Sequence, residues 1–258
     1  MYYDQHMHTH HSPDSVERFE NYLALSEKPI VTTEHLDFFS PAQNKPDHIP
    51  DFAAYEAEFE RLNARYGNRI LKGLEVGFRK EDEKAILYYL DGKELDLMLL
   101  SIHHNGWYNF MEVGNDDVPL DRTLEEYYAM MLEGVRSFPQ ANVLAHFDYG
   151  LRRYDVSIEE LQTVERILKR IFEEMIRHGI AFELNTSSMY KHQNVHLYEY
   201  AIGLYQSVGG KLFTVGSDAH KVEDYEAHFD KAFDLLKRQG VQKLAVFKNL
   251  EYRLVPVP

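Results

Sequence analysis

Histidine is concentrated at the start of this chain. The stretch MYYDQHMHTHHSPDS places four of the 14 histidines within six positions: His6, His8, His10 and His11. His6 and His8 are two positions apart, and in an extended chain such residues point to the same side. Both imidazoles can therefore reach one metal ion. Spacing alone also allows a solvent-exposed histidine-rich terminus or part of an expression tag.

The same residue types recur where later strand-like segments end. In chain order they are His35 in TEHLD, Glu75 in GLEVGF, His103 and His104 in LLSIHHN, His146 in VLAHFDY, and Asp218 and His220 in TVGSDAH. Functional residues of β/α barrels gather at the C-terminal ends of the strands. Core packing does not explain so many ionisable groups in one place, since each costs several kcal/mol if it is buried without a partner. The recurrence predicts a shared metal site.

The mixture of side chains indicates the kind of metal. Imidazole and carboxylate ligands without sulfur suit Zn²⁺, Mn²⁺ or Fe²⁺, and the chain contains no cysteine. The candidates outnumber the roughly four to six ligands that one such ion takes. We therefore expect two to three divalent ions, with Glu75 as the natural bridging carboxylate.

Alternating strands and helices are expected to position these residues. Strand-like runs occupy 1–5, 29–33, 69–76, 95–102, 142–145, 180–185 and 211–215. Helical patterns lie at 51–67, 123–138, 157–178, 195–208 and 222–239, and the third of these opens with the capping box Ser-Ile-Glu-Glu. Helices between strands predict βαβ units and a parallel sheet. With this many strands, an α/β barrel is favoured over an open sheet.

Composition limits the possible partners. The chain has 258 residues, 44% of them hydrophobic, which suits one barrel domain over 1–258. The net charge of −14 repels nucleic acid, and no Lys/Arg-rich run forms a basic groove. No apolar segment approaches the ~18 residues of a membrane span, and the start does not resemble a signal peptide. We expect a cytoplasmic protein without a nucleic-acid or membrane partner; its oligomeric state is not predicted.

Six short motifs together resemble those of the polymerase and histidinol phosphatase (PHP) superfamily. They are HMH near the N-terminus, TEH after the second strand, and then GLEV, SIHH, LAHFD and GSDAH, spanning residues 6–220. Each motif is weak alone, but six in this order are specific. The resemblance implies a distorted (β/α)7 barrel with a trinuclear metal cluster at the C-terminal ends of the strands.

The resemblance also implies how the ligands divide among the ions. The first set is His6, His8, Glu75 and Asp218; the second shares Glu75 and adds His103 and His146; the third combines His35 and His220 with a residue of the first loop. Some relatives have a histidine at that loop position, where this chain has Asp14. His10 and His11 are near enough to compete with Asp14.

The motifs resemble the histidinol-phosphatase branch more than the polymerase-associated one. FELNTSSMYKHQN contains that branch's ELNTS segment followed by Lys191, and HFDYGLRRY supplies Arg152 and Arg153 just past a ligand strand. Arg152 or Arg153, together with Lys191, is expected to hold phosphate oxygens, because a planar guanidinium matches phosphate bidentately. The alternative is that they are surface cations. The implied reaction is hydrolysis of L-histidinol phosphate, a small phosphate monoester, to L-histidinol and phosphate in histidine biosynthesis.

The chemistry of this reaction gives three residues catalytic roles. Phosphate monoesters hydrolyse very slowly unaided, and two divalent ions bridged by Glu75 can activate a water molecule at neutral pH. Asp218 would support the same centre, and His104 is a candidate proton donor for the leaving alkoxide. The aromatic loop at 105–110 follows SIHH directly and is either a substrate wall or a structural loop.

Three other functions stay open. A PHP phosphatase acting on phosphotyrosine or another monoester would use the same metal core, and substrate profiling distinguishes it. A PHP nuclease would degrade DNA ends. A catalytically inactive metal-binding module would show itself by a missing ligand, and every motif here retains its ligand.

Overall fold

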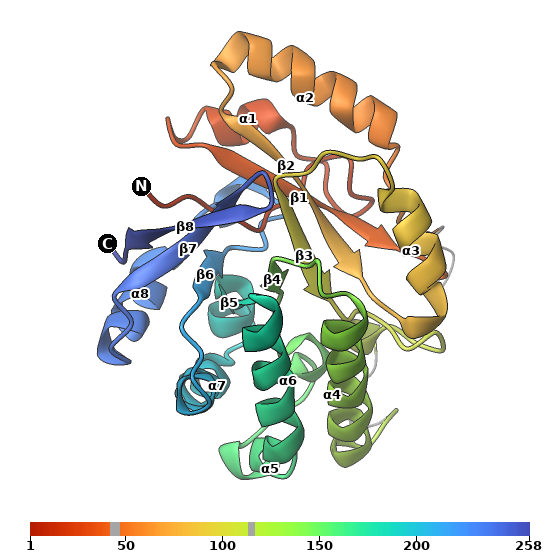
Figure 1. Ribbon diagram of the computed structural model, residues 1–258, viewed down its shortest axis with the longest axis vertical. Helices are drawn as coiled ribbons and strands as arrows, with labels where there is room; N and C mark the ends of the chain where they lie inside the picture. Colours follow the sequence, from red (N-terminus) through yellow and green to blue (C-terminus); the bar gives the residue numbers. More distant parts are fainter. Residues whose placement is uncertain (42–46, 113–116) are drawn as a thin grey trace.

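The computed structural model describes residues 1–41, 47–112 and 117–258. Six parallel strands form one curled sheet in the order β1-β2-β3-β4-β5-β6 (Figure 1). Their bounds are β1 Ile30–Asp37, β2 Ile70–Gly77, β3 Leu97–Ser101, β4 Val143–Leu144, β5 Ala181–Asn185 and β6 Phe213–Gly216. All six are buried along their length, as expected for strands covered on both faces. The predicted α/β fold is confirmed.

The N-terminal segment closes the gap between β6 and β1. The amide of Asp218 donates to the carbonyl of His6 at 2.8 Å, and the amide of Thr33 donates to the carbonyl of Met7 at 2.7 Å. The segment forms only an isolated bridge, between Met7 and Ala219. The strand expected at 1–5 is therefore wrong in position: the paired backbone is at 6–8, where the first histidines lie.

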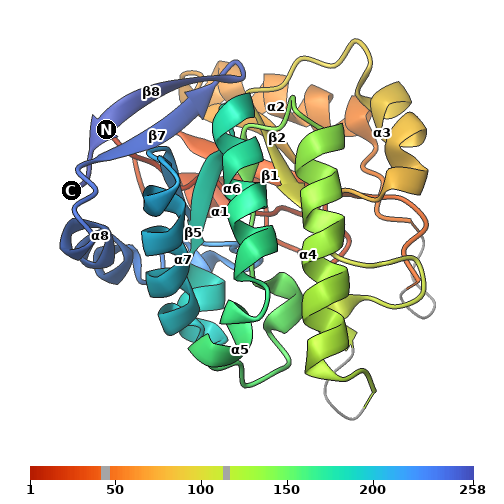
Figure 2. The same ribbon diagram turned by 60° about the horizontal axis from the view of Figure 1, so that its bottom comes forward.

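Helices surround the sheet. They are α1 Phe19–Leu23, α2 Phe52–Tyr66, α3 Glu83–Leu90, α4 Leu120–Ser137, α5 Ile158–Gln162, α6 Glu165–His178, α7 Val195–Ser207 and α8 Phe229–Arg238. Figure 2 shows α4, α6 and α7 side by side along the outside of the sheet. Within the described residues, no helix combines the length and the apolar character needed to cross a membrane.

Local signals explain where several helices begin and end. The Asp51 side chain accepts from the amide of Ala54 at 3.1 Å, and Gly67 ends the helix at a φ of 72°. The capping box at Ser157 is present, but it opens the short α5, so the helix expected at 157–178 is two helices. The helix expected at 222–239 begins only at Phe229. Helices α1 and α3 were not predicted.

An antiparallel hairpin, β7 Lys243–Lys248 and β8 Glu251–Pro256, was also not predicted. Its turn docks where β3 and β4 begin. The Asn249 amide donates to Asp96 Oδ1 at 3.0 Å, and the Asn142 side chain donates to the carbonyl of Leu250 at 3.1 Å. The hairpin therefore covers the N-terminal end of the barrel, opposite the ends that carry the predicted ligands.

The first prediction concerns this contact. Asn142 is buried, and its Oδ1 also accepts from the amide of Met98 at 2.8 Å. Asn142→Ala leaves buried backbone groups without partners, which should lower the free energy of unfolding by about 1–3 kcal/mol. Denaturant unfolding measures this. Asn21→Ala, at an exposed position on α1, is the control, and an equal loss in both variants would contradict the expectation.

Candidate metal centre

Glu75, on β2, lies at the centre of the histidine cluster. Its carboxylate is fully buried and has imidazoles on both oxygens. Oε1 is 2.6 Å from His146 Nε2 and 3.0 Å from His103 Nε2. Oε2 is 3.0 Å from His35 Nδ1, and His35 is its register partner on β1. A carboxylate placed between rings from β1 and from the segments that follow β3 and β4 can bridge two metal ions.

The N-terminal histidines reach the same carboxylate. His6 Nε2 lies 3.4 Å from Glu75 Oε2 and 3.5 Å from Asp218 Oδ1. His8 Nε2 lies 3.5 Å from each of these oxygens. Both imidazole nitrogens are buried and have no hydrogen-bond partner among the described residues. Buried polar atoms are nearly always paired in native proteins, so these two nitrogens, facing carboxylates, fit metal ligands.

Asp14, from the first loop, completes a third group. Its Oδ2 is 3.3 Å from His35 Nε2 and 3.3 Å from His220 Nε2. The ring of His8 stacks against both of these rings, with centroids 4.3 and 4.1 Å apart. The loop, β1 and the segment after β6 thus deliver three ligand-type atoms to one place.

The structure brings all nine predicted ligands together. Sets whose ligand atoms lie within 4.8 Å of one another are His8, His35 and His220; His6, His146 and Asp218; His6, His8 and Glu75; and His35, Glu75 and His103. Imidazole and carboxylate in these sets could hold divalent metal ions. The division of ligands among particular ions is taken up below as a proposal.

The cluster stabilises its own charges. Burial by itself would raise the pKa of Glu75, but the imidazoles of His103 and His6 outweigh burial and hold this pKa well below its ordinary value. The pKa of Asp218 is likewise held well below its ordinary value, with His6 as the largest cause opposing burial. Both carboxylates therefore remain anionic and available to cations.

Two carboxylates that sequence reasoning missed orient the ligands. Glu183, on β5, contacts His6 Nδ1 at 2.7 Å, and Asp37, on β1, contacts His103 Nδ1 at 2.8 Å. Such outer partners fix the tautomer and direction of a metal-binding imidazole. Strand periodicity was the available signal, because Asp37 lies two residues after His35 and therefore faces the same side.

Two glycines make room for these pairs. A Cβ on Gly216, at the end of β6, would overlap the carboxylate of Glu183 and come within 2.5 Å of His6 Cβ. A Cβ on Gly77, at the end of β2, would overlap the carboxylate of Asp37. The glycines of the GLEVGF and TVGSDAH motifs therefore allow the close approach that the ligands require.

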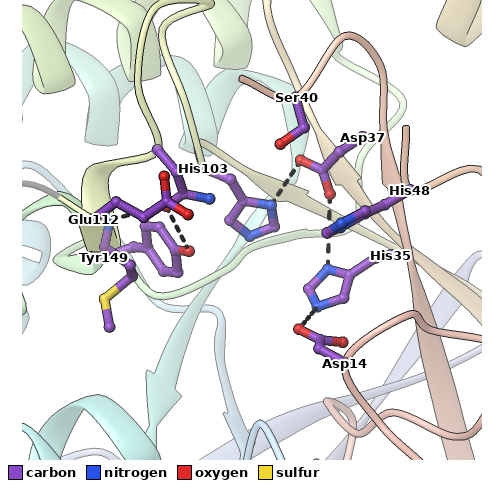
Figure 3. Close-up of a pocket in the computed structure, with 10 residues that line it drawn as sticks. Asp14, His35, Asp37, Ser40, His48, His103, Glu112 and Tyr149 are labelled. Atoms are coloured by element: carbon purple, nitrogen blue, oxygen red, sulfur yellow. Dashed lines mark hydrogen bonds and ion pairs between the residues drawn. The ribbon is translucent and has the colours of Figure 1, made fainter. Parts of the chain in front are cut away.

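A pocket opens above the cluster. It is lined by Asp14, His35, Asp37, Ser40, His48, His103, Asn109, Met111, Glu112 and Tyr149. Figure 3 shows Tyr149 on one side, His35 and His48 on the other, and His103 between them. Of the loop at 105–110, for which a substrate wall and a structural loop were the two alternatives, Asn109 lines the pocket, whereas Trp107 is 88% exposed.

The predicted substrate-binding cations are placed very differently. The side chain of Arg152 is buried at the cluster, and its Nη2 is 3.1 Å from Asp218 Oδ2. Arg153, next along the chain, is exposed. Lys191 is exposed at the end of the helical turn Ser187–Lys191.

His104 does not join the ligands. Within the described residues, its ring forms one hydrogen bond, in which the amide of Gly106 donates to Nδ1 at 3.2 Å. Its side chain is also not part of the pocket lining. The geometry therefore gives no support to His104 as a proton donor at the cluster.

Fold and site together define a β/α-barrel protein whose strand ends carry a cluster of imidazoles and carboxylates that could hold metal ions. Residues 4–187 match the sequence model of the PHP domain. The chain therefore belongs to the PHP domain family, which confirms the superfamily indicated by the sequence motifs.

Relatives resemble the chain along nearly its whole length. Histidinol-phosphatase from Lactococcus lactis subsp. lactis (strain IL1403) is 28% identical, over 96% of this chain and 95% of the relative. Probable histidinol-phosphatase from Clostridium acetobutylicum is 28% identical, over 97% and 98%. The crystal structure of histidinol phosphate phosphatase from the same Lactococcus strain, complexed with zinc, L-histidinol and phosphate, superposes with a TM-score of 0.85 at 25% identity, covering 97% of this chain and 98% of that one.

The second prediction tests the close approach at Gly216. Gly216→Ala should displace Glu183 or His6 and lower the bound metal per chain, because the added methyl overlaps their side chains. Elemental analysis after gel filtration measures the loss. Gly203→Ala, on α7 with open space at its Cβ, is the matched control. Equal metal content in the two variants would show that the close approach is dispensable.

Proposed function

We propose that this protein hydrolyses L-histidinol phosphate to L-histidinol and phosphate, using two to three divalent metal ions. The observation that carries the proposal is the convergence of nine imidazole and carboxylate side chains, with Glu75 at their centre, at the C-terminal ends of the strands. Support also comes from relatives that share nearly the full length and are named for this activity. The ions would be zinc, iron or manganese, which suit this donor set.

The proposed site has three ion positions, divided as the resemblance to the PHP superfamily implies. One would be held by His6, His8, Glu75 and Asp218; a second by Glu75, His103 and His146; and a third by Asp14, His35 and His220. Bound divalent ions polarise phosphoryl oxygens and make water a better nucleophile at neutral pH. In the proposed reaction, Glu75 and Asp218 hold the ions in place, while Glu183 and Asp37 hold the imidazoles in position.

Arg152 is the proposed phosphate-binding cation. Its Nε donates to Ser188 Oγ at 2.7 Å, and its Nη2 points at Asp218. Within the described residues, its Nη1 has no hydrogen-bond partner, so this nitrogen can donate to a phosphoryl oxygen. Burial opposes the charge, but Asp218 and Asp148 outweigh it and raise the pKa of Arg152, which keeps the guanidinium cationic.

The pocket suits a small cationic leaving group. Tyr149 packs against His103 and His146, with ring centroids 4.8 and 5.0 Å apart, and forms an aromatic wall. Its hydroxyl donates to Asn109 Oδ1 at 3.2 Å. Glu112 lies at the same opening and offers a carboxylate to the ammonium or imidazole of histidinol. Arg153 and Lys191, being exposed, have no role in this proposal.

Phosphate release from a panel of esters tests the function. The third prediction is that metal-loaded protein prefers histidinol phosphate over phosphotyrosine, phosphoserine and a nucleotide, and loses activity after chelation. Glu75→Gln keeps the shape of the central side chain, removes its charge, and should lower kcat by orders of magnitude. Preference for phosphotyrosine would indicate another phosphatase of the family, and degradation of DNA ends would indicate a nuclease.

The fourth prediction separates the two adjacent arginines. Arg152→Ala should lower kcat/KM about ten- to a hundredfold, because a charged hydrogen bond is worth ~1.5–3 kcal/mol. Arg153→Ala is the matched control and should retain wild-type kcat/KM, since Arg153 is exposed. The loss should be similar for every phosphate monoester, and metal content is measured in parallel. A larger loss of kcat/KM in Arg153→Ala than in Arg152→Ala would show that the phosphate site proposed here is in the wrong place.

A further inference from the structure

His10 and His11 do not compete with Asp14 for the central cluster. They turn instead toward α2, where both meet the same carboxylate oxygen. Glu58 Oε2 is 3.0 Å from His10 Nε2 and 3.1 Å from His11 Nε2. This convergence lies outside the metal centre, whose third group contains Asp14, His35 and His220.

Aromatic packing holds the two imidazoles in place. The ring of His11 lies 5.2 Å from that of Tyr55 and 5.9 Å from that of Phe19. The ring of His10 is 6.4 Å from Phe19 in an edge-on contact, and the two imidazole centroids are 4.3 Å apart. The side chains are only 26%, 10% and 15% exposed for His10, His11 and Glu58. The donor atoms are therefore positioned before any ligand binds.

Two further contacts orient the converging atoms toward one another. His10 Nδ1 lies 3.4 Å from the carbonyl of Glu17; a proton on Nδ1 leaves the Nε2 lone pair exposed, as in most metal-binding histidines. Arg61 donates to the other oxygen of Glu58, Oε1, at 2.9 Å. That bond orients the carboxylate and leaves Oε2 facing the imidazoles.

We propose that His10, His11 and Glu58 form an accessory site for one divalent cation of the zinc type. His10 Nε2, His11 Nε2 and Glu58 Oε2 lie within 4.8 Å of one another. A tetrahedral zinc ion with bonds of ~2.0–2.1 Å separates its ligands by roughly 3.3 Å, close to the observed 3.0 and 3.1 Å. Water takes the fourth position. Two histidines, one glutamate and no sulfur suit zinc.

The position of this site gives it a structural effect. His10 and His11 lie between His8 and Asp14, on the loop that contributes Asp14 to the third group of the metal centre. Glu58 is on α2. Figure 1 shows α2 beside α1 on the outside of the barrel. An ion bound here joins the loop to that helix and so limits the movement of Asp14.

Calorimetric titration tests the proposal. The probe is Zn²⁺ alone, added to protein whose main centre is already metal-loaded. Wild type should bind one additional ion per chain. His10→Gln, His11→Gln and Glu58→Gln should each weaken this binding at least about tenfold, since each removes a direct ligand. His178→Gln is the matched control, because His178 also neighbours a glutamate, Glu174, at 3.9 Å, but without a second imidazole on that oxygen.

Two results would contradict the proposal of an accessory zinc site. One is the absence of an additional zinc ion in wild type. The other is unchanged zinc binding in folded His10→Gln, whose ring is the most exposed of the three groups and whose replacement disturbs packing least. Circular dichroism verifies the fold of each variant. The readout is zinc binding rather than phosphate release, so this outcome is independent of the function proposed above.

Discussion

The rest of the molecule depends on one buried carboxylate, that of Glu75, held among imidazoles. Burying such a charge without a partner would cost too much free energy for the fold to be stable. A single ion pair often does not offset the cost of removing both charges from water. Here each oxygen faces histidines from different parts of the barrel. Glu183 and Asp37 fix the orientation of the His6 and His103 imidazoles. Gly216 and Gly77 provide the space for these two carboxylates. Several otherwise unrelated sequence positions are thus constrained by a single interaction.

The same constraint connects the site with barrel closure. The N-terminal backbone at 6–8 lies between β6 and β1 with few main-chain hydrogen bonds. The side chains of this segment, His6 and His8, face Glu75 and Asp218. Metal ions bound there would hold the closing segment through its side chains, where sheet pairing is sparse. Binding to the native state alone stabilises a protein by mass action, so folding and metal occupancy should be coupled.

The sequence indicated the fold class and the ligand set because both follow from short-range patterns. Strand ends with ligand residues recur in order, and periodicity places them on one face. Patterns of this kind could not show that Arg152 is buried beside Asp218 while Arg153 is exposed, since that depends on a turn after β4. They also missed Glu183, which resembles any strand residue until its distance to His6 is known. The hairpin β7–β8 was missed although 244–247 is a short apolar run and 251–254 alternates polar and apolar residues, both of which are strand signals.

That hairpin supports the end of the barrel opposite the candidate metal centre. Its turn is attached to Asp96 and Asn142, at the amino ends of β3 and β4, and the N-terminal Tyr3 and Gln5 also hydrogen bond to it. In β/α barrels this end serves stability while the opposite end carries chemistry. Substitutions in the hairpin turn should therefore change thermal stability more than substrate selectivity, whereas substitutions at Gln5, which precedes the ligand His6, should change both.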